Sequence, residues 1–322
     1  MTVTSPAAVR TARLSDVPLK PVDSSIPPWP GEILRVRGVD LFVRRTPARS
    51  EDGEPALYVH GLGGASTNWT DLADLLADRL DGEAVDLPGF GHSGPVRRSG
   101  YSPLGHARTV ISLLEHRGRG PVHLFGNSLG GAVSVVVAAI RPDLVRSLTL
   151  VSPALPSLRP RRGSDVTLPL LLLPGLSRLV ERRLAALPPE RRARAVVELC
   201  FADPSTVPDN RFAEAVEEVV RRRDLPWAME AFTASLRGLA LSYATPGERS
   251  LWRYAASVRA PTLVVWGTED RLVPVSLAPR AARAIPDARL LVLTGVGHVA
   301  QLEAPEPVAR AFLGLVEESG GG

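Results

Sequence analysis

The stretch VHLFGNSLGGAVSVVVAAI, residues 122–140, decides how this chain is expected to fold. Its first residues, 122–125, predict a short buried strand, and residues 132–140 predict a buried helix. The hexapeptide GNSLGG between them leaves almost no room for a turn. The glycines therefore serve close packing alone, or they display the single serine for chemistry.

Ser128 occupies the middle of a G-x-S-x-G pattern between that strand and that helix. A serine in such a tight turn takes strained backbone geometry, and the flanking glycines remove side chains that would collide with strand and helix. The hydroxyl then projects above the sheet, where the helix N-terminus directs N–H groups and a positive dipole end toward it. The context favours a nucleophile at Ser128; a tight structural turn with an idle serine is the alternative.

A serine hydroxyl needs a general base, and that base needs an acid partner. His298 follows the last predicted strand on a short glycine loop, whereas the other five of the six histidines lie at strand ends, in loops or on helix surfaces. Asp270 follows the predicted strand 262–266 and is the expected acid, with the adjacent Glu269 as its rival. The chain order is then Ser128, Asp270, His298, the serine–acid–histidine order of one particular fold.

Acyl chemistry at a serine also needs two donors for the tetrahedral oxyanion. The first expected donor is the backbone N–H of Leu129, which directly follows the nucleophile. The second is the N–H of Leu62, in the loop HGLGG at residues 60–64, where the glycines allow close approach. A role in packing alone is the alternative for this loop.

Short apolar runs alternate with helix-length segments over most of the chain, which predicts an α/β fold with a parallel sheet covered by helices on both faces. A predicted antiparallel hairpin at 33–46 comes first, and residues 1–30 are predicted to form a flexible leader. Strands are expected at 56–60, 84–86, 122–125, 148–151, 262–266 and 290–293, and helices at 69–80, 103–116, 129–140, 275–284 and 307–317.

One interval, between residues 151 and 262, contains helical periodicities in place of strands. They predict an all-helical cap at 153–258, inserted into a core made of residues 31–152 and 259–318. An insertion after a parallel strand lies above the crevice where such sheets bind ligands, so a lid is the natural hypothesis and a passive extension the alternative. The predicted helices are 175–187, 190–201, 210–223, 227–243 and 249–257.

Composition narrows the classes of partner. A net charge of +4, 5% aromatic residues and the lack of a binding motif argue against a nucleic-acid partner. The single cysteine, Cys200, excludes an intrachain disulfide and a zinc site of the Cys/His kind. The longest apolar run, 168–173, is too short to span a bilayer, and the first 30 residues lack a secretory h-region. We expect a cytoplasmic protein without stable membrane insertion, acting on a small molecule; oligomeric state is not predicted.

Five segments together resemble the α/β-hydrolase superfamily, in order and well spaced: YVHGLGG, DLPGFGHS, FGNSLGGA, VVWGTEDRLVP and GVGHVAQLEAPE. The resemblance runs from about residue 33 to 317. It implies the α/β-hydrolase fold, a mostly parallel eight-stranded sheet flanked by helices with a helical cap inserted after the sixth strand, and catalysis without a cofactor or metal. It also implies the site roles in full: Ser128 as nucleophile, Asp270 as acid, His298 as base, Leu62 and Leu129 as oxyanion donors.

The resemblance leaves several activities open. A serine nucleophile indicates hydrolysis of a carboxylic ester, so we expect an apolar ester to be hydrolysed through an acyl-enzyme. Asn127 and Trp266 look like those of meta-cleavage carbon–carbon hydrolases, although HGLGG departs from that group's proline-containing loop. With Gly61, they are the residues expected beside the substrate. A cofactor-free perhydrolase and a ligand receptor are the remaining alternatives.

Overall fold

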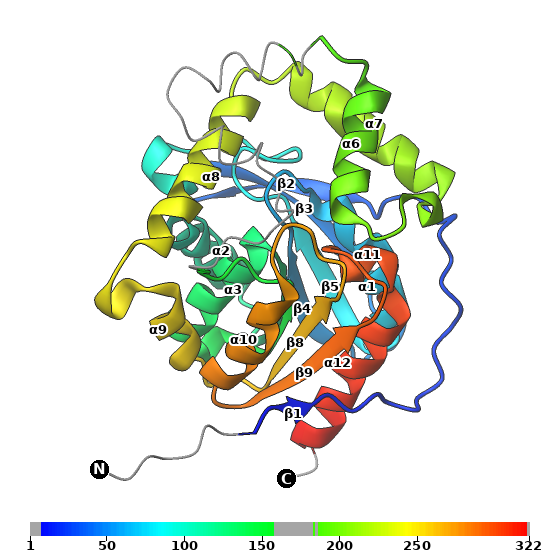
Figure 1. Cartoon of the computed structure of the whole chain (residues 1–322), viewed down its shortest axis with the longest axis vertical. Helices are drawn as coiled ribbons and strands as arrows, with labels where there is room; N and C mark the ends of the chain where they lie inside the picture. Colours follow the sequence, from blue (N-terminus) through cyan, green and yellow to red (C-terminus); the bar gives the residue numbers. More distant parts are fainter. Residues whose placement is uncertain (1–7, 158–182, 184–185, 321–322) are drawn as a thin grey trace.

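The computed structural model describes residues 8–157, 183 and 186–320 (Figure 1). Its centre is a nine-stranded sheet with the order β1-β9-β8-β7-β6-β4-β5-β3-β2. Neighbouring strands are parallel except where β3 pairs with β2 and with β5. The strands are β1 (Arg10–Thr11), β2 (Gly31–Val36), β3 (Val39–Thr46), β4 (Glu54–Val59), β5 (Leu80–Val85), β6 (Val122–Asn127), β7 (Val145–Val151), β8 (Thr262–Gly267) and β9 (Ala288–Leu293).

The sheet has one strand more than the eight that were expected. The extra strand, β1, pairs in parallel with β9 and lies within the segment 1–30 that the sequence predicts to be a flexible leader. The following residues run along helix α12 (Pro305–Gly320): Ser15 is buried, and its N–H donates to the Arg310 carbonyl over 3.0 Å. Prolines, serines and scattered charges suggest flexibility, but such a composition does not reveal pairing with an existing sheet edge.

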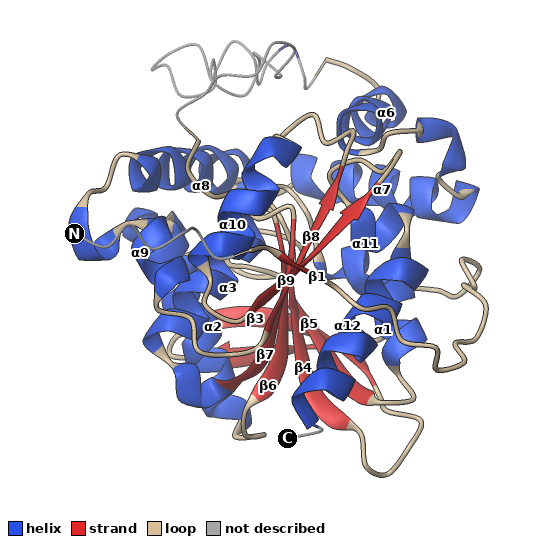
Figure 2. Cartoon of the chain, turned by 60° about the horizontal axis from the view of Figure 1, so that its bottom comes forward, coloured by secondary structure: helices blue, strands red, loops and turns tan. Residues whose placement is uncertain are grey.

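Two cores lie on the two faces of the sheet. Successive side chains of a strand point to opposite faces. In β4, Leu57 and Val59 accordingly join one core, and Ala56 and Tyr58 join the other. Figure 2 shows α2, α3 and α9 on one side of the sheet and α1 and α12 on the other. The helices of these layers are α1 (Thr70–Leu76), α2 (Pro103–Arg117), α3 (Leu129–Ile140), α9 (Leu251–Ala256), α10 (Ala278–Ala284), α11 (Ala300–Glu303) and α12.

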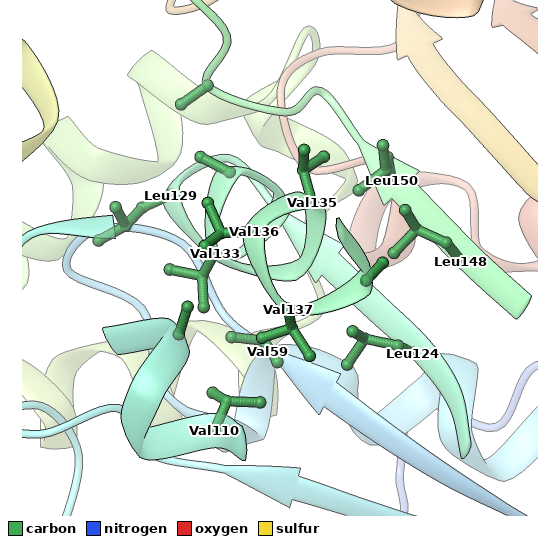
Figure 3. Packing of buried hydrophobic residues seen from close by; sticks show 14 of the residues in the cluster. Val59, Val110, Leu124, Leu129, Val133, Val135, Val136, Val137, Leu148 and Leu150 are labelled. Atoms are coloured by element: carbon green, nitrogen blue, oxygen red, sulfur yellow. The ribbon is translucent and has the colours of Figure 1, made fainter. Parts of the chain in front are cut away.

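Helix α3 is buried on nearly every side. Valines at 133, 135, 136 and 137 belong to the same buried cluster as strand residues such as Leu124 and Leu148, part of which is drawn in Figure 3. A run of β-branched residues lowers intrinsic helix propensity. Burying each such side chain contributes about 1.5–3 kcal/mol, so packing outweighs propensity here. The helix is thereby fixed against the sheet, and its N-terminus is fixed at the carboxyl end of β6.

Of the helices described between β7 and β8, α6 (Pro189–Cys200), α7 (Asp209–Arg223) and α8 (Ala228–Tyr243) lie above the carboxyl ends of the central strands (Figure 1). We call these three helices and the segments that join them the cap. The helix predicted at 175–187 lies almost entirely outside the described residues. Helix α9, expected to belong to the cap at 153–258, instead packs beside α3, where Leu251 and Ala255 are buried in the core. Periodicity predicts a helix but does not say which layer it joins.

In the described part of the chain, none of the helices combines the length and the apolar character needed to cross a membrane.

Candidate active site

Ser128 lies between β6 and α3 with φ of 52° and ψ of −114°. Few residues other than glycine adopt such a conformation, because it brings the side chain into collision with its own backbone. Three backbone hydrogen bonds hold it: the Ser128 N–H donates to the Val151 carbonyl over 3.0 Å, and its carbonyl accepts from the N–H groups of Ala132 and Ala154 over 3.0 and 2.9 Å. The strained turn is therefore fixed by β7 and α3 together.

Gly130 allows α3 to approach the neighbouring strand. A Cβ atom at this position would lie 2.2 Å from the carbonyl oxygen of Val59 and 2.5 Å from that of His60. No side chain can be accommodated at such distances, so the steric reason given for the G-x-S-x-G spacing holds here. The close approach also brings the segment after β4 to the serine.

His298 and Asp270 form a buried pair. The Nδ1 atom of His298 lies 2.9 Å from Oδ2 of Asp270. The other carboxylate oxygen accepts the N–H groups of Leu272 and Val273 over 2.9 and 2.8 Å. Burial alone would raise the pKa of Asp270, but the charge and hydrogen bond of His298 and the Val273 N–H hold that pKa below its usual range.

This pairing determines the state of the imidazole ring. An ionised carboxylate only accepts hydrogen bonds, so the proton of a neutral His298 ring is on Nδ1 and its Nε2 is left as an acceptor. The rival carboxylate, Glu269, is exposed, and its Oε1 accepts from the hydroxyl of Thr268 over 3.3 Å. Of the two candidate acids, the structure brings Asp270 to the histidine.

The loop that carries His298 is anchored to the cap. The His298 N–H donates to the carbonyl of Cys200, at the end of α6, over 2.7 Å. The carboxylate of Glu303 accepts the N–H of Gly297 over 2.7 Å and that of Ala202 over 3.0 Å. Glu303 thus joins the histidine loop to the segment after α6.

The loop at 60–64 lies against the serine. A Cβ atom at Gly61 would be 3.1 Å from the Cβ of Ser128. Leu62 follows directly, and Leu129 is the first residue of α3, where N–H groups have no acceptor within the helix. Of the two residues predicted to supply oxyanion donors, Leu129 therefore follows Ser128 directly and Leu62 follows Gly61, which lies against Ser128.

Asn127 and Trp266, which were expected beside the substrate together with Gly61, are both buried. The side-chain amide of Asn127 donates to the carbonyls of Val151 and His298, each over 3.1 Å. The Trp266 indole N–H donates to the Val273 carbonyl over 2.9 Å. These contacts hold the histidine loop and the acid loop in place, and a direct role in substrate binding stays a prediction.

Two cap residues at the site were missed by the sequence analysis. The guanidinium of Arg222 donates to the carbonyl of Gly63, in the loop at 60–64. A Cβ atom at Gly63 would lie 3.1 Å from a ring carbon of Phe232. No motif marks either residue, since Arg222 is one of three consecutive arginines and Phe232 one apolar residue of a long helix.

Comparisons with known proteins find similarity over most of the chain. A family profile described as the alpha/beta hydrolase fold matches residues 55–305. The dihydrolipoyllysine-residue acetyltransferase component of the acetoin cleaving system of Pseudomonas putida is 34% identical, over 83% of this chain. The chain spans 65% of that relative's length.

Two further relatives are hydrolases by name. A 2-hydroxy-6-oxononadienedioate/2-hydroxy-6-oxononatrienedioate hydrolase of Cupriavidus pinatubonensis is 29% identical over 82% of this chain and 85% of its own. The crystal structure of a membrane phospholipase A, described as a bacterial virulence factor, superposes with a TM-score of 0.72 at 25% identity, over 92% of this chain and 88% of the other.

Proposed function

Because the chain belongs to the alpha/beta hydrolase fold family, we propose that it is a serine hydrolase that cleaves a carboxylic ester through an acyl-enzyme. Ser128 is the nucleophile, His298 the general base and Asp270 the acid that orients the base. The N–H groups of Leu62 and Leu129 stabilise the oxyanion. The substrate is a small molecule, and its hydrolysis needs only water.

The proposed reaction has two halves. His298 Nε2 removes the hydroxyl proton of Ser128 while Oγ bonds to the ester carbonyl carbon, and the carbonyl π pair moves to oxygen, where the two N–H groups bind it. Collapse of this intermediate breaks the bond to the alcohol, which leaves with the proton from His298. Water then attacks the acyl-enzyme in the same way and releases the carboxylic acid.

The contact that carries this proposal is the 2.9 Å pair between His298 Nδ1 and Asp270 Oδ2. It leaves Nε2 unprotonated, as a base requires, on a loop at the carboxyl end of β9. Ser128 is held in a strained turn near the same edge of the sheet. Strained backbone persists where the surrounding structure maintains it, often at active sites. The likeness to a phospholipase A supports an ester as the substrate.

The test is hydrolysis of short-chain p-nitrophenyl esters. Ser128→Ala is expected to lower kcat by about 10⁴-fold or more, and Asp270→Asn by about 10⁴-fold. Ser134→Ala is the matched control, because Ser134 is a buried serine of α3 behind the turn. Equal rates for the wild type and Ser128→Ala would exclude the proposal. A larger loss in Glu269→Gln than in Asp270→Asn would exclude the acid assignment.

Carbon–carbon bond hydrolysis is the second candidate. It is favoured by Asn127 and Trp266 in the sequence and by the relative from Cupriavidus pinatubonensis, since the compound in that relative's name has no ester to hydrolyse. The two candidates are distinguished by offering the enzyme a vinylogous dienone acid and an ester of similar size. A higher kcat/KM for the dienone, lost in Ser128→Ala, would replace the ester assignment.

A further inference from the structure

Arg222 of α7 connects the cap to the loop at 60–64. Its Nη2 atom donates to the carbonyl of Gly63 and, over 3.4 Å, to that of Gly64. Its Nε atom donates to Oε1 of Glu218, one helical turn earlier, over 2.7 Å. The guanidinium is therefore held by its own helix while it binds two successive carbonyls of the loop.

Those carbonyls belong to the turn that presents Leu62. Gly63 has φ of 73°, in the left-handed region. The N–H of Gly64 donates to the Gly61 carbonyl over 2.9 Å. That carbonyl shares a peptide plane with the N–H of Leu62, so whatever holds the turn also sets the direction of this N–H.

The buried ring of His60 supports the same peptide. Its Nε2 accepts the N–H of Leu87 over 2.9 Å, so its proton is on Nδ1, which donates to the Gly61 carbonyl over 2.7 Å. Burial holds the pKa of His60 below its usual value, and the positive charge of Arg222 acts in the same direction. The neutral ring is thus kept as a donor to Gly61.

Arg222 also brings charge to this turn. Glu218 is shared with Arg221, which donates to both carboxylate oxygens over 2.6 and 3.0 Å. Burial alone would raise the pKa of Glu218, but the two arginines hold it below its usual range, so the carboxylate is ionised. One carboxylate faces two guanidinium groups, which leaves positive charge beside a loop expected to bind an oxyanion.

We propose that Arg222 is a positioning residue for the oxyanion site: anchored by Glu218, it holds the Gly63 and Gly64 carbonyls toward the cap and thereby keeps the Leu62 N–H directed at the reacting carbonyl oxygen. This inference rests on the proposed function, because it requires an oxyanion. Arg222 acts through the loop and is not itself a catalytic residue. Its loss weakens binding of the transition state more than binding of the substrate.

The experiment compares Arg222→Gln and Arg222→Lys with Arg221→Gln. Arg221 is the matched control, since its described hydrogen bonds go to Glu218 on the same helix. For each variant, kcat and KM are measured on a p-nitrophenyl ester. Inhibition constants are measured for an alkyl trifluoromethyl ketone, which Ser128 converts to an oxyanion-bearing adduct, and for an alcohol of the same chain length, which mimics bound substrate.

Arg222→Gln is expected to lower kcat about 10- to 100-fold with little change in KM, because small displacements of a donor are costly. Its affinity for the trifluoromethyl ketone should fall by a similar factor, and its affinity for the alcohol by less than about twofold. Arg222→Lys, which keeps the charge, should fall between Arg222→Gln and the wild type, and Arg221→Gln should match the wild type.

Equal weakening of both inhibitors, or a kcat for Arg222→Gln equal to that of Arg221→Gln, would overturn the inference and leave the proposed function standing. A wild type that neither hydrolyses esters nor binds the trifluoromethyl ketone would overturn the proposed function, and the inference with it. Arg222→Lys keeps the test decisive if Arg222→Gln fails to fold.

Discussion

Ser128 has a backbone conformation that is strained for serine but would not be strained for glycine. Its φ of 52° and ψ of −114° belong to a region that costs a non-glycine residue of the order of 1–3 kcal/mol. Ser128→Ala keeps this strain, whereas Ser128→Gly removes it at the cost of a more flexible unfolded chain. We expect Ser128→Gly to have a free energy of unfolding about 1 kcal/mol above that of Ser128→Ala, measured by urea denaturation.

Ser134 provides the control for that comparison. It lies inside α3 with ordinary helical geometry, where alanine is favoured over glycine by about 1 kcal/mol. The order of stability should therefore be reversed, with Ser134→Ala above Ser134→Gly. If alanine were the more stable replacement at both positions, Ser128 would not be strained, and the turn would lose one of the arguments for its role.

Candidate site residues that belong to a local sequence pattern could be predicted from the sequence. Residues that contact the site loops from the cap helices could not. Ser128, Asp270 and His298 each follow a predicted strand and have a glycine within three residues, so their positions near one sheet edge follow from parallel topology. Arg222 gives no such signal, because Arg221 and Arg223 are identical neighbours in sequence. Cys200 acts through its backbone carbonyl, which is the same for every residue type.

At the scale of elements, one buried ion pair joins α7 to α1. The side chains of Arg211 and Asp71 are 8% and 6% exposed, and Nε of Arg211 donates to Oδ2 of Asp71 over 3.3 Å. Glu214 shares the same guanidinium. Arg211→Met leaves these carboxylates uncompensated, so we expect the free energy of unfolding to fall by about 3–5 kcal/mol. Denaturant unfolding measures the change.

The double variant Arg211→Met/Asp71→Leu distinguishes two costs: the loss of the attraction between the two side chains, and the burial of an Asp71 carboxylate without a partner. It should recover part of the stability, because Asp71 is then no longer buried without a partner. The exposed pair of Arg253 and Glu248 is the control, and Arg253→Met should change stability little. A double variant no more stable than Arg211→Met alone would show that Asp71 is not the source of the cost.

Elements with strong periodic patterns were predicted to within a few residues, and the exceptions have physical causes. Helix α3 coincides with the predicted 129–140, because its apolar run and glycine start are both local. Helix α1 ends at Leu76, before the end predicted at residue 80, because Leu80 is already the first residue of β5. β1 has two residues and exists through its pairing with β9, which no local pattern reports.

Over the whole molecule, the cap and the core share the loops of the site. The end of α6 holds the histidine loop through the Cys200 carbonyl, and Glu303 binds both segments. Helix α7 holds the loop at 60–64 through Arg222. On α8, the hydroxyl of Ser235 lies 3.0 Å from Nε2 of His106, a buried residue of α2. Protonation of His106 would place a charge in this buried contact between α2 and α8. Low pH should therefore lower the stability of the whole fold.

The stability of the protein is expected to fall as the pH is lowered from 7.5 to 5.5. His60, His106 and His123 are buried, and burial lowers the pKa of each, that of His106 to about 3. In the unfolded chain these histidines take up protons near pH 6.5, whereas the folded state excludes them. Their contribution is therefore fully present above about pH 6.5 and is lost below it, at up to about 1.4 kcal/mol per histidine and pH unit.

Urea unfolding at several pH values measures how the free energy of unfolding depends on pH. The variant His106→Gln isolates the contribution of His106 to that dependence. Glutamine can keep a hydrogen bond to Ser235 but does not titrate, so the variant should lose about one proton from the pH dependence. The wild type, unfolded at the same pH values, is the reference for the variant. If the free energy of unfolding of His106→Gln changed with pH as steeply as that of the wild type, His106 would already be protonated in the folded state. The contact between α2 and α8 would then not be neutral.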